Sequence, residues 1–189
     1  MFGMVAGAIS KGINDKTLST MFSNTDALIN QAEKILLQTL SSNSVQVKEP
    51  ISILYSEAYK TASESYSKDS FSLVQARGYR RIDAKKRANA INLFEALGIR
   101  GQLYTTFTFE KGIIGVGKLK TGLLKAYTSM DVLILDENGK KVFQKKYSAH
   151  SDKSVYVVSG IYGSKDLMEL FPETMQAVSK AFAESLKKN

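Results

Sequence analysis

The stretch Gln102-Leu-Tyr-Thr-Thr-Phe-Thr-Phe109 decides the fold class, because aromatic and β-branched residues fill most of it. Such residues pack well on a pleated surface, so the stretch predicts a β-strand. Two further strand-like segments, 126–135 and 140–148, flank the sequence Asp136-Glu-Asn-Gly139. The Asn-Gly pair in this connection tolerates positive φ angles and is typical of a hairpin turn. The middle of the chain therefore predicts an antiparallel meander.

Helical patterns lie on both sides of this meander. Before it, apolar residues recur at helical spacing over 25–40 and 83–97, and Gly98 stands where a helix end favours a left-handed residue. After it, Pro172 opens an amphipathic segment over 173–188. We expect an α+β fold, with a single mixed, largely antiparallel sheet, a C-terminal hairpin meander and helices packed on the sheet.

Shorter segments are harder to assign. Residues 51–55 and 155–158 predict short strands, and 71–75 predict either a strand or the end of the preceding element. Residues 56–70 are polar without a clean apolar face, so they suit a solvated helical turn or a loop.

The length of 189 residues suits one domain. We expect residues 1–24, rich in Gly, Ala and Ser, to form a loosely packed lead-in with a short helix at most. Residues 25–189 then form a single α/β domain. The first ten residues lack the basic start of a signal peptide. The sequence is compatible with a cytoplasmic protein, or with a periplasmic one, anchored to the outer membrane, whose export signal and lipidation site have been trimmed.

The formal net charge of +8 favours acidic partners, such as anionic lipid headgroups, nucleic acid, cell-wall polymers or acidic proteins. Lysines scattered over solvated faces explain the same charge without any partner. The chain has no cysteine, which excludes disulfides, thiolate metal sites and a cysteine nucleophile.

Two features resemble catalytic motifs. Gly112-Ile-Ile-Gly-Val-Gly-Lys118 matches half of a phosphate-binding loop, but Leu119 replaces the hydroxyl residue that would bind magnesium. The predicted hairpin downstream also conflicts with the parallel sheet of such enzymes. His150 is the single histidine, and the sequence contains no nucleophile elbow that would supply a serine for a catalytic triad. We predict that His150 is a surface residue at a strand end. We therefore expect no enzymatic activity, no catalytic residues, no metal, no cofactor and no small-molecule substrate.

A basic cluster lies at the start of the second predicted helix. Arginine binds phosphate and carboxylate groups through two hydrogen bonds, so the cluster is a candidate anion- or partner-binding patch. It is also explained as the solvated face of an amphipathic helix. Its members are Arg77, Arg80, Arg81, Lys85, Lys86 and Arg87.

A glycine-rich apolar segment follows the first predicted strand of the meander. Apolar side chains next to lysines suit a membrane interface, where the lysines meet lipid headgroups. A hairpin tucked onto the core is the alternative interpretation. The candidate membrane contacts are Ile113, Ile114, Val116, Lys118 and Leu119.

The order of elements resembles a known family. A helix, the turn Ala96-Leu-Gly-Ile-Arg-Gly101, a long strand, a Glu-Asn-Gly turn and a C-terminal helix follow one another over residues 50–189. This order is similar to the small α/β domain of bacterial cell-envelope lipoproteins, which include the N-terminal domain of TolB, CsgG and LpoB. The resemblance implies a non-catalytic periplasmic module that binds another envelope protein or helps an assembly at the outer membrane.

Three functions remain open. The first is a non-catalytic cell-envelope binding or assembly module that acts through a protein or membrane surface. The second is a membrane-inserting lipoprotein that uses its apolar segments. The third is a cytoplasmic nucleic-acid or anion binder, whose affinity would fall steeply with salt.

Overall fold

The computed structural model describes residues 2–9, 25–64, 73–76, 79, 82, 87–114 and 121–187. The strands within these ranges are β1 (Phe2–Ile9), β2 (Leu73–Gln75), β3 (Gly101–Ile114), β4 (Gly122–Asp136), β5 (Lys141–His150) and β6 (Val155–Val157). The helices are α2 (Thr25–Ser42), α3 (Pro50–Leu54), α4 (Glu57–Glu64), α5 (Arg87–Leu97), α6 (Ser164–Met168) and α7 (Phe171–Leu186).

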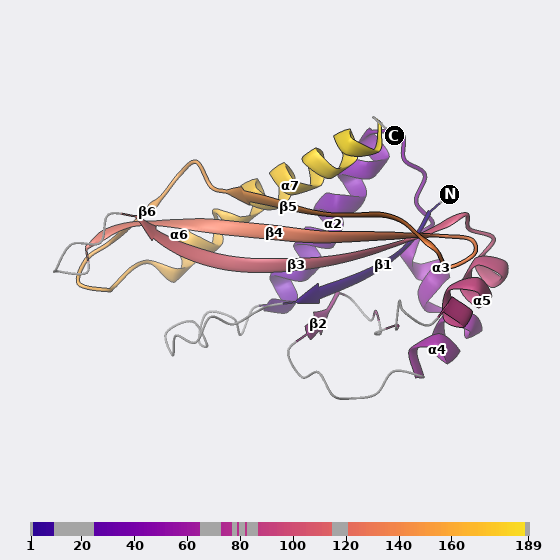
Figure 1. The fold of residues 1–189 in the computed structure, drawn as a ribbon. Coiled ribbons are helices and arrows are strands. Elements are labelled where there is room, and N and C mark those ends of the chain that lie inside the picture. Colours follow the sequence, from indigo (N-terminus) through magenta and orange to yellow (C-terminus); the bar gives the residue numbers. More distant parts are fainter. Residues whose placement is uncertain are drawn as a thin grey trace.

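The strands form one mixed sheet in the order β2-β1-β3-β4-β5, and β6 pairs with β4 next to the end of β5. Strand β1 runs parallel to β3, and the other pairs are antiparallel. The α+β fold and the largely antiparallel meander predicted from the sequence are therefore confirmed. Figure 1 shows β3 and β4 as the longest strands, extending away from the end that carries α3, α4 and α5.

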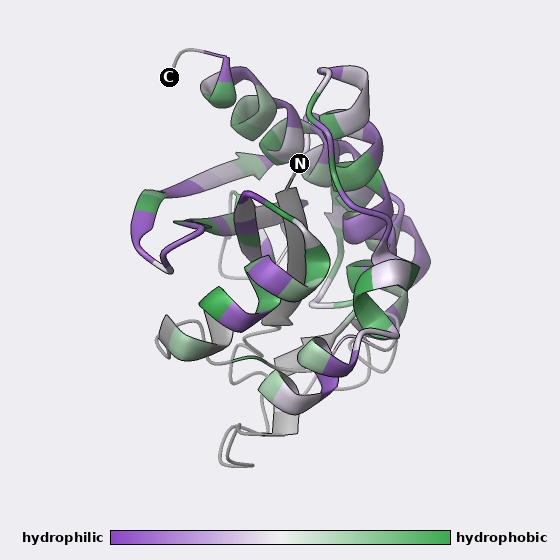
Figure 2. Ribbon diagram, turned by 90° about the vertical axis from the view of Figure 1, so that its right-hand side faces the viewer, coloured by the Kyte–Doolittle hydropathy of each residue, from purple (hydrophilic) through white to green (hydrophobic). Residues whose placement is uncertain are grey.

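Helices α2 and α7 pack together on one face of the sheet, and the end-on view of Figure 2 shows them side by side above the strands. Alternate residues of β4 from Leu124 to Ile134 point toward this helical layer and are buried. Phe109 of β3 meets Phe171 of α7 edge-on, with ring centroids 5.6 Å apart. The core therefore lies between the sheet and the α2–α7 pair, as period-2 burial in an antiparallel sheet requires.

The N-terminal segment differs from the expectation. Residues 2–9 form strand β1 between β2 and β3 rather than a loosely packed lead-in or a short helix. A strand flanked on both sides reads as a nearly continuous apolar run, so Phe2–Ile9 lacks the alternation that reveals an edge strand. The rest of the expected lead-in, residues 10–24, lies outside the described residues.

The predicted strand at 51–55 is wrong, because Pro50–Leu54 form the one-turn helix α3. Proline in the first turn sets a helical φ and lacks only an N–H that would be unpaired there. The buried Ile53 holds this turn against the core, whereas Ile51 is exposed. The apolar residues at every second position imitate a strand over a segment too short to show a helical period.

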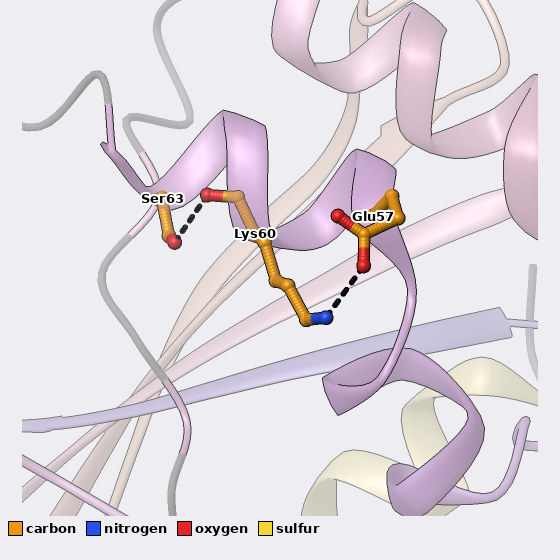
Figure 3. Close-up of polar contacts among 3 residues, drawn as sticks. All are labelled: Glu57, Lys60 and Ser63. Atoms are coloured by element: carbon orange, nitrogen blue, oxygen red, sulfur yellow. Dashed lines mark hydrogen bonds and ion pairs between the residues drawn. The ribbon is translucent and has the colours of Figure 1, made fainter.

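Polar residues 57–64 form the helix α4, one of the two forms predicted for this segment. In Figure 3 the Lys60 ammonium meets the Glu57 carboxylate at 2.5 Å, and the Ser63 hydroxyl donates to the Lys60 carbonyl at 2.7 Å. Glu57 is largely exposed, so this ion pair adds little to stability.

The predicted hairpin is confirmed, but its turn differs in detail. Gly139 has a φ of 69°, whereas Asn138 does not adopt a positive φ. Gly139 N–H donates to the Asp136 carbonyl, and Asp136 N–H donates to the Lys140 carbonyl, both at 2.9 Å. The register shift next to the turn, between Ile134 and Leu135, goes with this longer connection.

Candidate functional site

Apolar side chains are exposed together at the end of the sheet formed by β6 and the adjoining ends of β3 and β4. This end lies far from α3, α4 and α5 (Figure 1). We call it the distal tip and define it by Ile114, Leu123, Tyr156, Val158 and Ile161.

Three of these residues lie in one row across the sheet. Ile114 pairs with Leu123, and Leu123 pairs with Tyr156. Directly opposed residues of antiparallel strands share a face and lie close together. This face is opposite the helical layer, because the neighbouring Leu124 is the residue that is buried. The row is therefore an apolar surface, and its outermost member, Tyr156, is 79% exposed.

The other two residues flank a tight turn. Val158 and Ile161 exchange both backbone hydrogen bonds, at 3.0 and 2.9 Å. Between them, Ser159 and Gly160 have φ angles of 51° and 81°, as in a type I′ turn. The side chains of Val158 and Ile161 are 61% and 77% exposed. The two hydrogen bonds of the turn hold the backbone between them in place.

The sequence next to this surface is rich in lysine. From Lys111 to Lys125 the chain carries four lysines, Lys111, Lys118, Lys120 and Lys125, and no acidic residue. The Lys111 ammonium donates to the Tyr162 hydroxyl at 3.0 Å and lies 4.9 Å from the centre of its ring. This contact ties β3 to the segment that follows the Val158–Ile161 turn.

The predicted membrane contacts are only partly described. Ile114 is exposed at the distal tip. The backbone of Ile113 lies in β3, and Val116, Lys118 and Leu119 lie outside the described residues. Leu123 belongs to the same apolar, glycine-rich part of the sequence as Ile114, whereas Tyr156, Val158 and Ile161 were not predicted to join this surface. The signal available for the last two was the Ser-Gly pair between them, a pair that is typical of a tight turn.

Most residues of the basic cluster are not among those that the structure describes. Arg77, Arg80, Arg81, Lys85 and Lys86 lie outside the described residues, and Arg87 is placed through its backbone as the first residue of α5. Its anion-binding role stays a prediction.

The two features that resemble catalytic motifs, the glycine-rich segment 112–118 and His150, differ in their structural setting from the motifs that they resemble. A phosphate-binding loop connects a strand to a helix. Here Gly112 lies within β3, and the next described element is the antiparallel strand β4. His150 is the exposed last residue of β5, as predicted, and its ring lies 5.8 Å from that of Tyr127.

A second feature lies near the opposite end, between α2 and α3. A cavity of about 450 Å³ is lined there by Leu37, Ile51, Leu54 and other residues, with the buried Glu33 and Tyr79 among them. Burial, and then the negative charge of Glu33, raise the pKa of the Tyr79 hydroxyl well above its ordinary value.

Two features are absent from the part of the chain that the structure describes. Its histidine, aspartate and glutamate side chains form no group of three or more that would hold a metal ion. None of its helices is long and apolar enough to cross a membrane.

The solved structures that are similar to this chain include that of a bacterial lipoprotein. The crystal structure of the lipoprotein GNA1162 from Neisseria meningitidis matches with a TM-score of 0.40 and 17% sequence identity, over 97% of this chain and 96% of that one. A similarity of this size carries no argument about function. No protein-family model and no curated protein matches the chain.

Proposed function

We propose that this protein is a non-catalytic binding module of the bacterial cell envelope that docks on an anionic membrane surface through its distal tip. The observation that carries the membrane contact is the gathering of exposed apolar side chains at one projecting end of the sheet. The envelope location rests on the resemblance in the order of elements, an order that α5, β3, β4, β5 and α7 follow.

Shape favours lipid over a protein partner at this surface. Strong protein interfaces centre on residues that fill well-packed pockets. Tyr156, Val158 and Ile161 instead project from a strand end and a two-residue turn, and the described cavities are lined by other residues. A fluid bilayer adapts its shape to a convex apolar projection. A rigid protein partner would need a hollow of matching shape.

Chemistry points the same way. Each apolar side chain that leaves water contributes roughly 1.5–3 kcal/mol when burial is complete. Each lysine near an anionic surface contributes about 1 kcal/mol more. Tyrosine is favoured at the boundary between lipid and water, because its ring is apolar and its hydroxyl reaches polar groups. The distal tip supplies the apolar side chains and the tyrosine, and Lys125 lies two residues from Leu123 on the same strand.

Vesicle flotation tests this proposal. We expect the protein to float with phosphatidylglycerol-containing vesicles at low salt, and a fraction to remain bound at about 0.5 M salt, where charge attraction is screened within a few Å. The triple variant Y156S/V158S/I161S should lose the salt-resistant fraction. V142S, which changes an exposed apolar residue of β5 outside the distal tip, is the matched control and should float like the wild type.

Two results would contradict the proposal. One is absence of the wild-type protein from the floating fraction under both salt conditions. The other is equal flotation of the triple variant and the wild type at high salt, which would assign the membrane contact to another part of the chain.

A further inference from the structure

Strand β5 forms one edge of the described sheet. It pairs with β4 on one side, and no strand among the described residues pairs with its other side. With ten residues it is a long edge strand, whereas β2, at the opposite edge, has three. A long edge offers a row of unpaired backbone N–H and C=O groups with which another extended chain can pair.

The register of β4 and β5 identifies these backbone groups. The Ser151 N–H donates to the Ala126 carbonyl at 2.9 Å, so this opposed pair is hydrogen-bonded. Hydrogen-bonded and non-hydrogen-bonded pairs alternate along an antiparallel ladder. The odd-numbered residues of β5 from 143 to 149 therefore bond to β4. The N–H and C=O groups of Gln144, Lys146 and Ser148 point away from the sheet.

Charge restricts what can pair with this edge. Strand β5 carries Lys141, Lys145 and Lys146 and no acidic residue. Within the described part of the chain, none of these ammonium groups forms an ion pair, although Asp131 of β4 lies directly opposite Lys146. A second copy of β5 would place lysines against lysines, which is unfavourable. An acidic strand would instead be attracted.

The two faces of β5 favour different side chains in an added strand. Phe143 and Tyr147 point toward α7, where their rings lie 6.0 and 5.9 Å from that of Phe182. Phe143 is still partly exposed, so an apolar side chain beside it would leave water. Lys146 lies on the other face and is exposed. An added strand that alternates apolar and acidic residues therefore fits both faces.

We propose that β5 binds an extended acidic segment of a partner protein, which adds to the sheet as an antiparallel strand. This direction is slightly more stable per residue than the parallel one. The backbone of the segment bonds to the outward-pointing groups of β5, its apolar side chains cover Phe143, and its acidic side chains face Lys146. The edge is separate from the distal tip, so this proposal does not depend on membrane docking.

Hydrogen exchange of the isotope-labelled full chain tests the proposal, with a peptide of alternating glutamate and valine as the probe. In the free protein, we expect the amides of Gln144, Lys146 and Ser148 to exchange faster than those of the residues between them. A saturating concentration of the peptide should slow these three amides by at least about tenfold, because each gains a hydrogen bond. A peptide of alternating lysine and valine should leave them unchanged.

Two methylated forms of the acidic peptide separate strand addition from simple charge attraction. Directly opposed residues of antiparallel strands share a face, so the glutamates are the residues whose N–H groups bond to β5. Methylation of the glutamate nitrogens should weaken binding by at least about tenfold, because several hydrogen bonds are lost. Methylation of the valine nitrogens should leave the affinity unchanged, since those N–H groups point away from β5.

A matched pair of charge reversals tests the role of Lys146. The variant K146E should bind the acidic peptide roughly tenfold more weakly, because an attraction across the new pair becomes a repulsion. The control K34E reverses an exposed lysine of α2 and changes the net charge equally, so it should bind like the wild type.

Several results would overturn the proposal. They are the absence of saturable binding of the acidic peptide, binding without slower exchange at Gln144, Lys146 and Ser148, equal affinities for the two methylated peptides, and equal affinities of K146E and K34E. Slow exchange of the three amides that depends on protein concentration without peptide would assign the edge to a second copy instead. If K146E fails to fold, the methylated peptides decide the question on the wild-type chain.

Discussion

Two buried threonine hydroxyls join the sheet to the C-terminal helix. Thr128 of β4 and Thr174 of α7 lie with their Oγ1 atoms 2.5 Å apart, and neither side chain is exposed to solvent. The Thr174 hydroxyl donates to the Phe171 carbonyl at 2.9 Å. Its proton is thereby used, so the Thr128 hydroxyl is the donor in the pair. The two residues consequently have unequal roles.

This asymmetry predicts unequal effects of the two valine substitutions. T174V leaves the Thr128 hydroxyl buried without a partner, which should lower the free energy of unfolding by about 1–3 kcal/mol. T128V should cost less, because Thr174 still donates to Phe171. The double variant should cost less than the sum of the two single changes. Urea unfolding of the four proteins measures these differences, and equal, additive losses would show that the hydroxyls act independently.

The turn between β4 and β5 shows how one side chain organises an element. The Asp136 carboxylate oxygen Oδ1 accepts hydrogen bonds from the N–H groups of Asn138 at 2.9 Å and Lys140 at 2.8 Å. Aspartate commonly stabilises turns by such local bonds to the backbone. The turn therefore depends on an oxygen acceptor at position 136 as well as on the positive φ of Gly139.

Replacing this acceptor should separate its hydrogen bonding from its charge. We expect D136A to lower the free energy of unfolding by about 1 kcal/mol, because two N–H groups of the turn lose their acceptor. D136N keeps an oxygen in place and should lose less than half as much. Thermal or urea unfolding checks both variants, and an equal loss in the two would assign the effect to charge instead.

Long elements with their own period were predictable from sequence. The apolar spacing of α2 and α7 identified these helices within two residues of their observed bounds. The aromatic and β-branched residues identified the start of β3, which continues to Ile114, beyond the predicted end at Phe109. Strand β1 and helix α3 were assigned wrongly, because the first has no alternation and the second is a single turn. The conformation of such segments is determined by tertiary packing, that is, by contacts with residues distant in the sequence.

The candidate site was predictable in part for the same reason. Ile114 belonged to an apolar, lysine-rich segment that stood out in the sequence. Its neighbours Leu123 and Tyr156 join it through the pairing register of three strands, and register depends on contacts distant in sequence. The cavity near α3 had no sequence signal, because Glu33 reads as an ordinary polar residue of a helix.

At the scale of the whole molecule, the distal tip and the cavity lie on different parts of the structure. The distal tip is at the far end of β3 and β4, whereas the cavity lies between α2 and α3, on the side of the sheet's other end (Figure 1). A protein docked on lipid through the distal tip would therefore keep the cavity in water. The long strands β3 and β4 extend between these two ends of the sheet (Figure 1).

The most direct test of membrane docking is the depth of a single labelled residue at the vesicle surface. The chain has no cysteine, so V158C and V142C each introduce one unique thiol for an environment-sensitive fluorophore. On anionic vesicles, we expect the label at position 158 to shift to the blue and to be quenched by lipids with nitroxides near the headgroup. The label at position 142 of β5 should remain in water. Emission typical of water at both positions, with the protein bound, would contradict insertion of the distal tip.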